Sequence, residues 1–254
     1  MKLVLSAFVL LSAAGKTFAA AAGTGTATAV GPLLGASLST GPNGPAISAP
    51  MQIIILLTLL ALLPAAVMCV TPFLRISIVL HFLRQALGTQ TAPSNQVLIG
   101  LGLFLSILVM QPVVKDIYHQ AWEPFEQGKL SMEQAVDQGE QPLRHFLLKF
   151  AREKDIQLFL GIAHAPRPRT PQDLDIKILI PAYIISELKA SFQIGTVLFL
   201  PFMVIDVVIA SITVSMGMVQ LPPVMLSAPF KILLFVLVDG WGLVIGSLMK
   251  GLYS

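Results

Sequence analysis

Two long apolar runs without a charged residue constrain this chain most. Residues 53–70 (IIILLTLLALLPAAVMCV) and 97–114 (VLIGLGLFLSILVMQPVV) each contain 18 residues and no Asp, Glu, Lys or Arg. A helix of that length extends for about 27 Å, close to the hydrocarbon thickness of a bilayer. Residues 194–219 and 224–249 are similarly apolar but hold one and two charged residues. The pattern predicts an all-α protein with about four apparent membrane spans.

The composition agrees with an integral membrane protein. Hydrophobic residues make up 55% of the chain and charged residues 11%, against about 25% charged in a typical soluble domain. A formal net charge of +3 gives no argument for binding nucleic acid. The single cysteine, Cys69, cannot form an intramolecular disulfide. Because no nucleophile, phosphate-binding or metal-ligand motif is present, we expect neither an enzyme nor a cofactor or metal.

The N-terminal region has the pattern of an exported protein. Residues 1–22 combine Lys2, a short apolar stretch and small residues, which is typical of a cleavable signal peptide; a short uncleaved anchor is the alternative. Residues 23–50 are uncharged and rich in Gly, Pro, Ser and Thr, which predicts a flexible leader. Residues 51–114 then form the first hydrophobic helical hairpin.

The charged residues gather in residues 115–177, which hold nine Lys/Arg and ten Asp/Glu. Ser131 and Gln134 have the spacing of a helix capping box. Pro142 suits the first turn of a second helix, and the proline-rich residues 165–171 end that helix. We therefore expect a small helical polar insert between the first hairpin and a second hydrophobic hairpin at residues 178–254.

Charge asymmetry predicts the orientation in the membrane. The segment 73–96 contains Arg75 and Arg84 and no acidic residue, whereas residues 115–177 have a net charge of −1. The positive-inside rule places the first segment in the cytoplasm and the polar insert on the periplasmic side. A signal peptide agrees with that orientation.

Three motifs resemble one known family. TPFLRISIVLHFLRQALGTQ (71–90), PAYIISELKASFQIG (181–195) and APFKILLFVLVDGW (228–241) are similar to the FliP family of type III secretion export-gate subunits. The resemblance covers about residues 51–254, and the leader also resembles that of the flagellar members. Virulence relatives of the SctR class usually lack a signal peptide, so the flagellar branch is favoured.

The resemblance implies a core subunit of the flagellar protein export gate in the bacterial inner membrane, within the flagellar basal body. Several copies, five by resemblance, assemble with FliQ and FliR into a ring-like helical channel that exports unfolded flagellar subunits. FlhA- and FlhB-like export components and membrane lipid are further expected partners. The apparent spans are expected to be bent hairpins packed on neighbouring subunits. The alternatives are a virulence export-gate subunit, a small channel or transporter, and a membrane-embedded enzyme.

Charges inside the last two apolar segments, and in the approach to the first of these two, are candidate functional residues. They are Glu187, Lys189, Asp206, Lys231 and Asp239. A charged residue at the centre of a bilayer costs about 2.5–3.5 kcal/mol on insertion scales. We expect these five residues to be buried, paired across helices or in contact with other subunits. A role in proton transfer is the less favoured alternative.

The segment 216–223 (MGMVQLPP) joins the two charged arms. Its tandem prolines, Pro222 and Pro223, predict a loop. Resemblance to the family implies that Met216 and Met218 belong to a methionine-rich gasket that narrows the export pore. Methionine side chains are flexible and suit a seal that must yield to a passing chain. The alternative is that both methionines fill the core of a tight turn.

Two further sets of residues are candidates for contacts with subunits or lipid. His81 and Arg84 lie on one polar arc of the helix predicted near the cytoplasmic surface, and Arg75 lies on the same helix but outside the arc. This polar face either contacts a subunit or headgroup, or simply extends toward water. Gly242 and Gly246 form a GxxxG pattern, which is typical of close helix packing in membranes.

Overall fold

The computed structural model describes residues 49–89, 91–166, 168, 170, 173–217 and 222–253. Within these residues every regular element is a helix, which confirms the all-α prediction. The signal peptide and the leader up to residue 48 lie outside the described residues. The helices are α3 (Ala49–Val70), α4 (Phe73–Ala86), α5 (Asn95–Ile117), the π-helix η1 (Tyr118–Trp122), α6 (Glu123–Glu126), α7 (Met132–Phe150), α8 (Glu153–Ile162), α9 (Ile176–Ser215), α10 (Pro223–Leu237) and α11 (Gly240–Tyr253).

The chain divides into two compact units. Among the described residues, the first unit contains 49–67 and 118–140, and the second contains 68–117 and 141–253. The first unit holds most of α3, together with η1, α6 and the beginning of α7. The second unit holds α4, α5, the rest of α7 and all helices from α8 onward, so it carries most of the residues singled out in the sequence.

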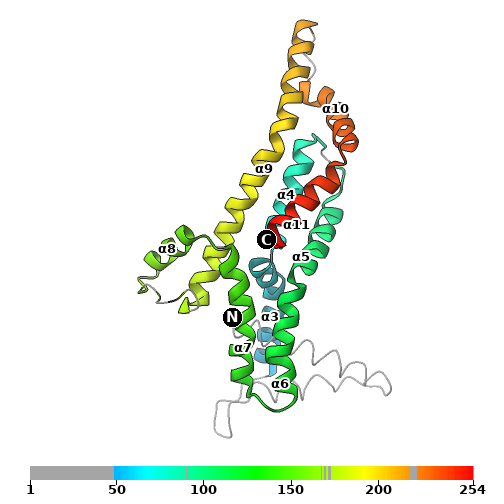
Figure 1. The fold of residues 1–254 in the computed structure, drawn as a ribbon. Coiled ribbons are helices and arrows are strands. Elements are labelled where there is room, and N and C mark those ends of the chain that lie inside the picture. Colours follow the sequence, from blue (N-terminus) through cyan, green and yellow to red (C-terminus); the bar gives the residue numbers. More distant parts are fainter. Residues whose placement is uncertain are drawn as a thin grey trace, which may run out of the picture. The chain divides into compact units, whose positions relative to one another are not determined.

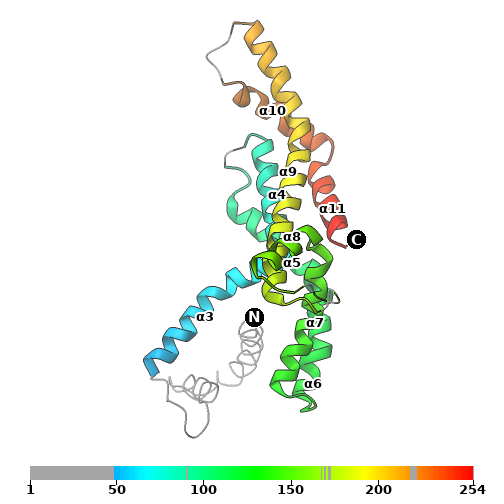
Figure 2. The same cartoon turned by 90° about the vertical axis from the view of Figure 1, so that its left-hand side faces the viewer.

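The core of the second unit forms where α4 lies along α9 (Figures 1 and 2). Helix α4 buries Ile76, Val79, Leu80 and Leu83 completely. Their spacing of three and four residues places them on one helical face. Helix α9 contributes Leu179, Ala182 and Tyr183 to the buried residues, α5 contributes Leu98, and α7 contributes Leu147. Burial of these apolar side chains holds the four helices together.

Helix α9 is a single helix of 40 residues. Its first turn is capped by Asp175, whose side chain accepts a hydrogen bond from the Lys177 backbone at 2.9 Å. The sequence pattern predicted a span over 194–219 only, which was wrong at both ends. The helix starts earlier because a continuous buried face runs from Ile176 to Gly195. The helix ends at Ser215. Pro181 and Pro201 lie inside it, and each lacks the backbone N–H that would donate one helical hydrogen bond.

Helices α10 and α11 replace the single span predicted over 224–249. They are bent by 66° relative to each other. Asp239, between them, has a positive φ of 51°. At the next residue, Gly240, a Cβ atom would lie 2.2 Å from the Phe235 ring. The bend therefore brings the backbone so close to Phe235 that only glycine fits at 240.

The polar region is helical, as predicted, but its division into helices differs. Ser131 and Gln134 exchange the two hydrogen bonds of a capping box, at 3.0 and 3.3 Å, which confirms that prediction. The prediction that Pro142 begins a second helix was wrong, because Pro142 lies inside α7. Buried apolar residues recur at helical spacing before and after it: Ala135, Val136, Leu143, Phe146 and Leu147.

Candidate functional site: charged contacts of the long helices and the α9–α10 loop

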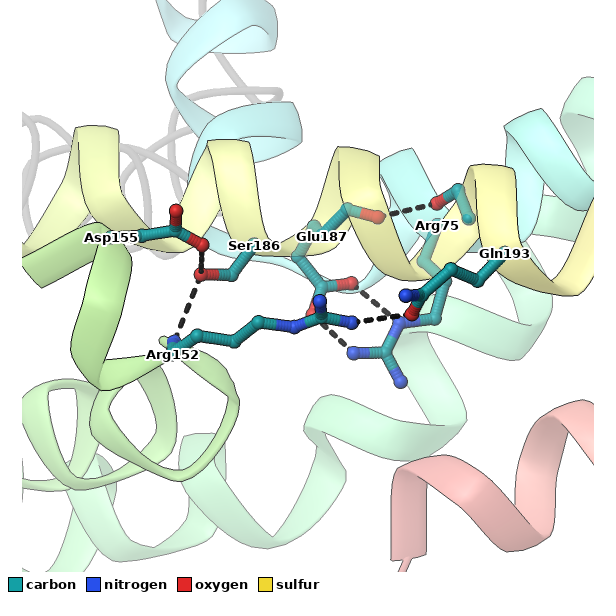
Figure 3. A network of polar contacts seen from close by, with 7 residues as sticks. Arg75, Arg152, Asp155, Ser186, Glu187 and Gln193 are labelled. Atoms are coloured by element: carbon teal, nitrogen blue, oxygen red, sulfur yellow. Dashed lines mark hydrogen bonds and ion pairs between the residues drawn. The ribbon is translucent and has the colours of Figure 1, made fainter.

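A buried ion pair connects α4 to α9. Arg75 Nε donates to Glu187 Oε2 at 2.8 Å, and the guanidinium also donates to Glu187 Oε1. Glu187 is completely buried and Arg75 is nearly so. Figure 3 shows the two side chains pointing toward each other. The Arg75 guanidinium also lies 5.1 Å from the Phe150 ring centroid, a distance typical of a cation–π contact.

Arg75 was expected on the same helix as His81 and Arg84 but outside their polar arc, and the structure agrees with that separation. Its side chain is buried in the ion pair, because it lies on the α4 face that packs against α9. His81 and Arg84 are partly exposed on another arc of α4. Arg84 donates to Asn95 Oδ1 at 2.5 Å and so contacts the start of α5. Contact of this arc with lipid or with another subunit remains a prediction.

A second polar network joins α8 to α9 (Figure 3). Asp155 is almost completely buried, and it accepts hydrogen bonds from Ser186 Oγ at 2.8 Å and from Lys189 Nζ. Ser186 Oγ also accepts from the Arg152 backbone N–H at 2.9 Å. The Arg152 side chain donates to Gln193 Oε1 at 2.7 Å. The network fixes the turn between α7 and α8 on the surface of α9.

The Asp155 carboxylate is held in its charged form. Burial by itself raises the pKa of Asp155. Hydrogen bonds from Lys189 and Ser186, and the positive charges of Lys189 and Arg152, outweigh that effect. The pKa therefore lies below its ordinary value of 3.8. The Lys189 side chain itself is 51% exposed, so this residue is not buried within the single chain.

A third contact holds α10 against α9. Lys231 Nζ donates to Asp206 Oδ2 at 2.7 Å, and Ser227 Oγ donates to Asp206 Oδ1. The Lys231 side chain is only 3% exposed and the Asp206 side chain 31%. Lys231 thus pairs across helices, as expected for a charge in an apolar segment. The two donors lie on one face of α10, since Ser227 precedes Lys231 by one helical turn.

Asp239, unlike Lys231, is not buried against another helix. It is exposed in the single chain, at the bend between α10 and α11. Its Oδ2 atom lies 2.4 Å from the position that a Cβ on Gly242 would take, so Gly242 makes room for this carboxylate. Around Gly246 a Cβ would meet no atom within 4 Å. The predicted role of Gly242 and Gly246 in subunit packing remains a prediction.

The loop between α9 and α10 is described only in part. Met216 follows the last residue of α9 and is 67% exposed. Gly217 has a positive φ of 76°, which ends the helix. Met218 lies outside the described residues, as do residues 219–221. Met216 is therefore not part of a core within the single chain, and its role as a gasket remains a prediction.

Several residues of these contacts were not identified from the sequence. They are Arg152, Asp155, Ser186, Gln193 and Ser227. Asp155 lies 31 residues from Ser186, and nothing in the spacing along the chain connects them. Ser227 carried a usable signal, because it lies four residues before Lys231 on the same helix.

The charged residues of the apolar helices are used in contacts between helices. The charged groups Glu187, Asp155 and Asp206 are each engaged by a cationic side chain. In the described part of the chain, no group of three His, Cys, Asp or Glu residues could hold a metal ion. Among the residues that the structure describes, three helices are long and apolar enough to cross a membrane, or four spans result if the bent pair α10–α11 counts as one. These features define a multi-helical membrane protein whose apolar helices are joined by ion pairs.

Comparison with known proteins identifies the family. The chain belongs to the FliP family, which matches residues 56–248. The flagellar biosynthetic protein FliP of Pectobacterium carotovorum subsp. carotovorum is 50% identical over 204 residues, covering 80% of this chain and 79% of that protein. FliP of Bacillus subtilis is 46% identical over 204 residues, covering 80% and 92%. FliP of Borreliella burgdorferi is 43% identical over 211 residues, covering 82% and 83%. The chain is thus a membrane protein of flagellum biogenesis and export.

Proposed function

We propose that this chain is a core subunit of the flagellar type III protein export gate. Several copies assemble with FliQ and FliR in the bacterial inner membrane, and the assembly forms the channel through which unfolded flagellar subunits leave the cell. Membership of the FliP family carries the proposal, because the match from residue 56 to 248 includes all of α4 to α10. In this proposal each chain contributes helices to the channel and has no catalytic role.

The surfaces of α9 and α10 support assembly with other helices. Both helices expose many large apolar side chains in the single chain: Val197, Leu200, Met203, Val204, Val207, Val208, Ile212, Val214, Phe230, Leu233, Val236 and Leu237. Apolar area of this extent requires a cover of protein or lipid. In a ring, neighbouring subunits cover much of it, and the Asp206–Lys231 pair keeps each α9–α10 hairpin closed.

Purification tests the assembly. The full chain is extracted from bacterial membranes in mild detergent with an affinity tag. The proposal expects a large complex that contains FliQ- and FliR-like proteins and restores motility to a strain that lacks its own FliP. A complex with virulence export proteins instead indicates the SctR branch. A chain that is purified alone, yet supports motility, contradicts the proposed assembly.

The sequence analysis expected a loop over 216–223, but α10 already begins at Pro223, so the loop that is proposed to seal the channel is the segment between α9 and α10. It leaves α9 with the exposed Met216, so a ring of copies would bring several methionines toward one axis. The double substitution Met216→Ala and Met218→Ala removes the flexible side chains and should make the inner membrane leak ions while the complex still assembles. Ion leakage is measured in intact cells, with Met203→Ala, an exposed methionine within α9, as the control. A tight membrane around an assembled double variant contradicts the seal.

A further inference from the structure

Pro112 leaves a carbonyl of α5 without its helical donor. In an α-helix the N–H of residue 112 donates to the carbonyl of residue 108. Proline has no N–H, so the Leu108 carbonyl loses this bond although α5 continues to Ile117. The Leu108 side chain is half exposed and lies in a helix apolar enough to cross a membrane. A backbone carbonyl in such surroundings must find another donor.

The donor for the Leu108 carbonyl is a side chain of α11. Tyr253 Oη donates to the Leu108 carbonyl oxygen at 3.0 Å, across 145 residues of sequence. Tyr253 is the last residue of α11, which packs against α5 (Figure 1). Its phenol group suits this position, because the ring is apolar and the hydroxyl is polar.

We infer that Tyr253 is a positioning residue that completes the hydrogen bonding of α5 at Pro112 and thereby fixes the end of α11 on α5. The bent arm α10–α11 is then held at two points. Lys231 of α10 donates a hydrogen bond to Asp206 of α9, and Tyr253 at the end of α11 donates one to Leu108 of α5. These two hydrogen bonds together fix the course of α10 and α11 after the α9–α10 loop.

The pair Tyr253 and Pro112 allows a decisive test. Tyr253→Phe removes only the hydroxyl. Pro112→Ala restores a backbone donor for Leu108 inside α5, so the carbonyl no longer depends on the hydroxyl alone. Amide hydrogen exchange of α11 is followed by mass spectrometry in the full chain, purified from bacterial membranes in mild detergent. The four proteins of the cycle are the original chain, the two single variants and the double variant.

We expect Tyr253→Phe to raise the exchange rate at the end of α11 by about 2- to 10-fold, as the loss of one hydrogen bond predicts. In the Pro112→Ala chain the same substitution should have a clearly smaller effect, because the Leu108 carbonyl then has a helical donor as well. Tyr118→Phe, which removes the hydroxyl of another half-exposed tyrosine, is the control and should leave α11 unchanged. An unchanged α11 in Tyr253→Phe overturns the inference, and so does an equal effect with and without Pro112.

Discussion

The pairing of Arg75 with Glu187 makes a prediction at the scale of single residues. Glu187 is completely buried, so Arg75→Ala leaves its carboxylate without its cationic partner. Breaking a buried ion pair in this way costs about 3–5 kcal/mol of folding free energy. We expect a large loss of folded protein in Arg75→Ala, measured by thermal unfolding in detergent.

Two further variants test whether the loss in Arg75→Ala comes from the unpaired charge of Glu187. The double variant Arg75→Met with Glu187→Leu removes both charges and should recover much of the loss. Arg84→Ala on the partly exposed arc of α4 loses the bond to Asn95, at a cost of about 1 kcal/mol. If Arg75→Ala were no worse than Arg84→Ala, the ion pair would not be what connects α4 to α9.

The lowered pKa of Asp155 leads to a prediction of how the stability of the fold depends on pH. The folded chain holds the pKa of Asp155 below its ordinary value of 3.8, because hydrogen bonds and positive charges outweigh burial. A lowered folded pKa stabilises the fold above the ordinary value, and that contribution is lost as the pH falls through the lowered pKa. Asp155→Asn should therefore destabilise the chain at neutral pH, and its difference from the original chain should shrink in acid.

Unfolding in denaturant at several pH values measures this difference. Glu153→Gln, on the exposed side of α8, is the matched control and should change little. A difference between Asp155→Asn and the original chain that stays constant from neutral pH down to well below 3.8 contradicts the role of the charge.

At the scale of helices, the close approach of α4 to α9 depends on Gly195. A Cβ atom there would lie 2.4 Å from the ring of Phe82, which packs edge-on to Phe192 and Phe199. Gly195→Ala should push the helices apart and cost about 1–3 kcal/mol. Thermal unfolding measures the cost. Gly100→Ala in α5 meets no atom within 4 Å and should be neutral or slightly stabilising. Equal stability of the two variants would show that α4 and α9 adjust freely.

At the scale of the whole molecule, the charge pattern predicts which side of the membrane each segment occupies. A cysteine introduced at Glu133 on α7, in a chain with Cys69→Ala, should react with a membrane-impermeant thiol reagent in cells whose outer membrane is permeabilised. A cysteine at Gln85, exposed at the end of α4, should react only after lysis. The opposite result would reverse the orientation that the positive-inside rule predicts.

The sequence by itself determined the helical class, the apolar segments, the capping box at Ser131 and the family. Hydrophobic periodicity, caps and motifs are local properties, so they can be identified from neighbouring residues. Helix continuity was harder to predict. Pro142 suggested a helix start, yet α7 continues through it, because one missing donor costs less than the apolar face gains by staying continuous.

Only the tertiary structure decided which charges meet. Lys231 pairs with Asp206 of the preceding apolar segment, whereas Asp239, which shares the segment 224–249 with Lys231, lies at the bend between α10 and α11. Arg75 pairs with Glu187, which lies 112 residues further along the chain, and nothing in the sequence pattern connects the two. The reason is that an ion pair or a hydrogen bond depends on how helices pack in space, and residues far apart in the sequence become neighbours only after that packing has formed.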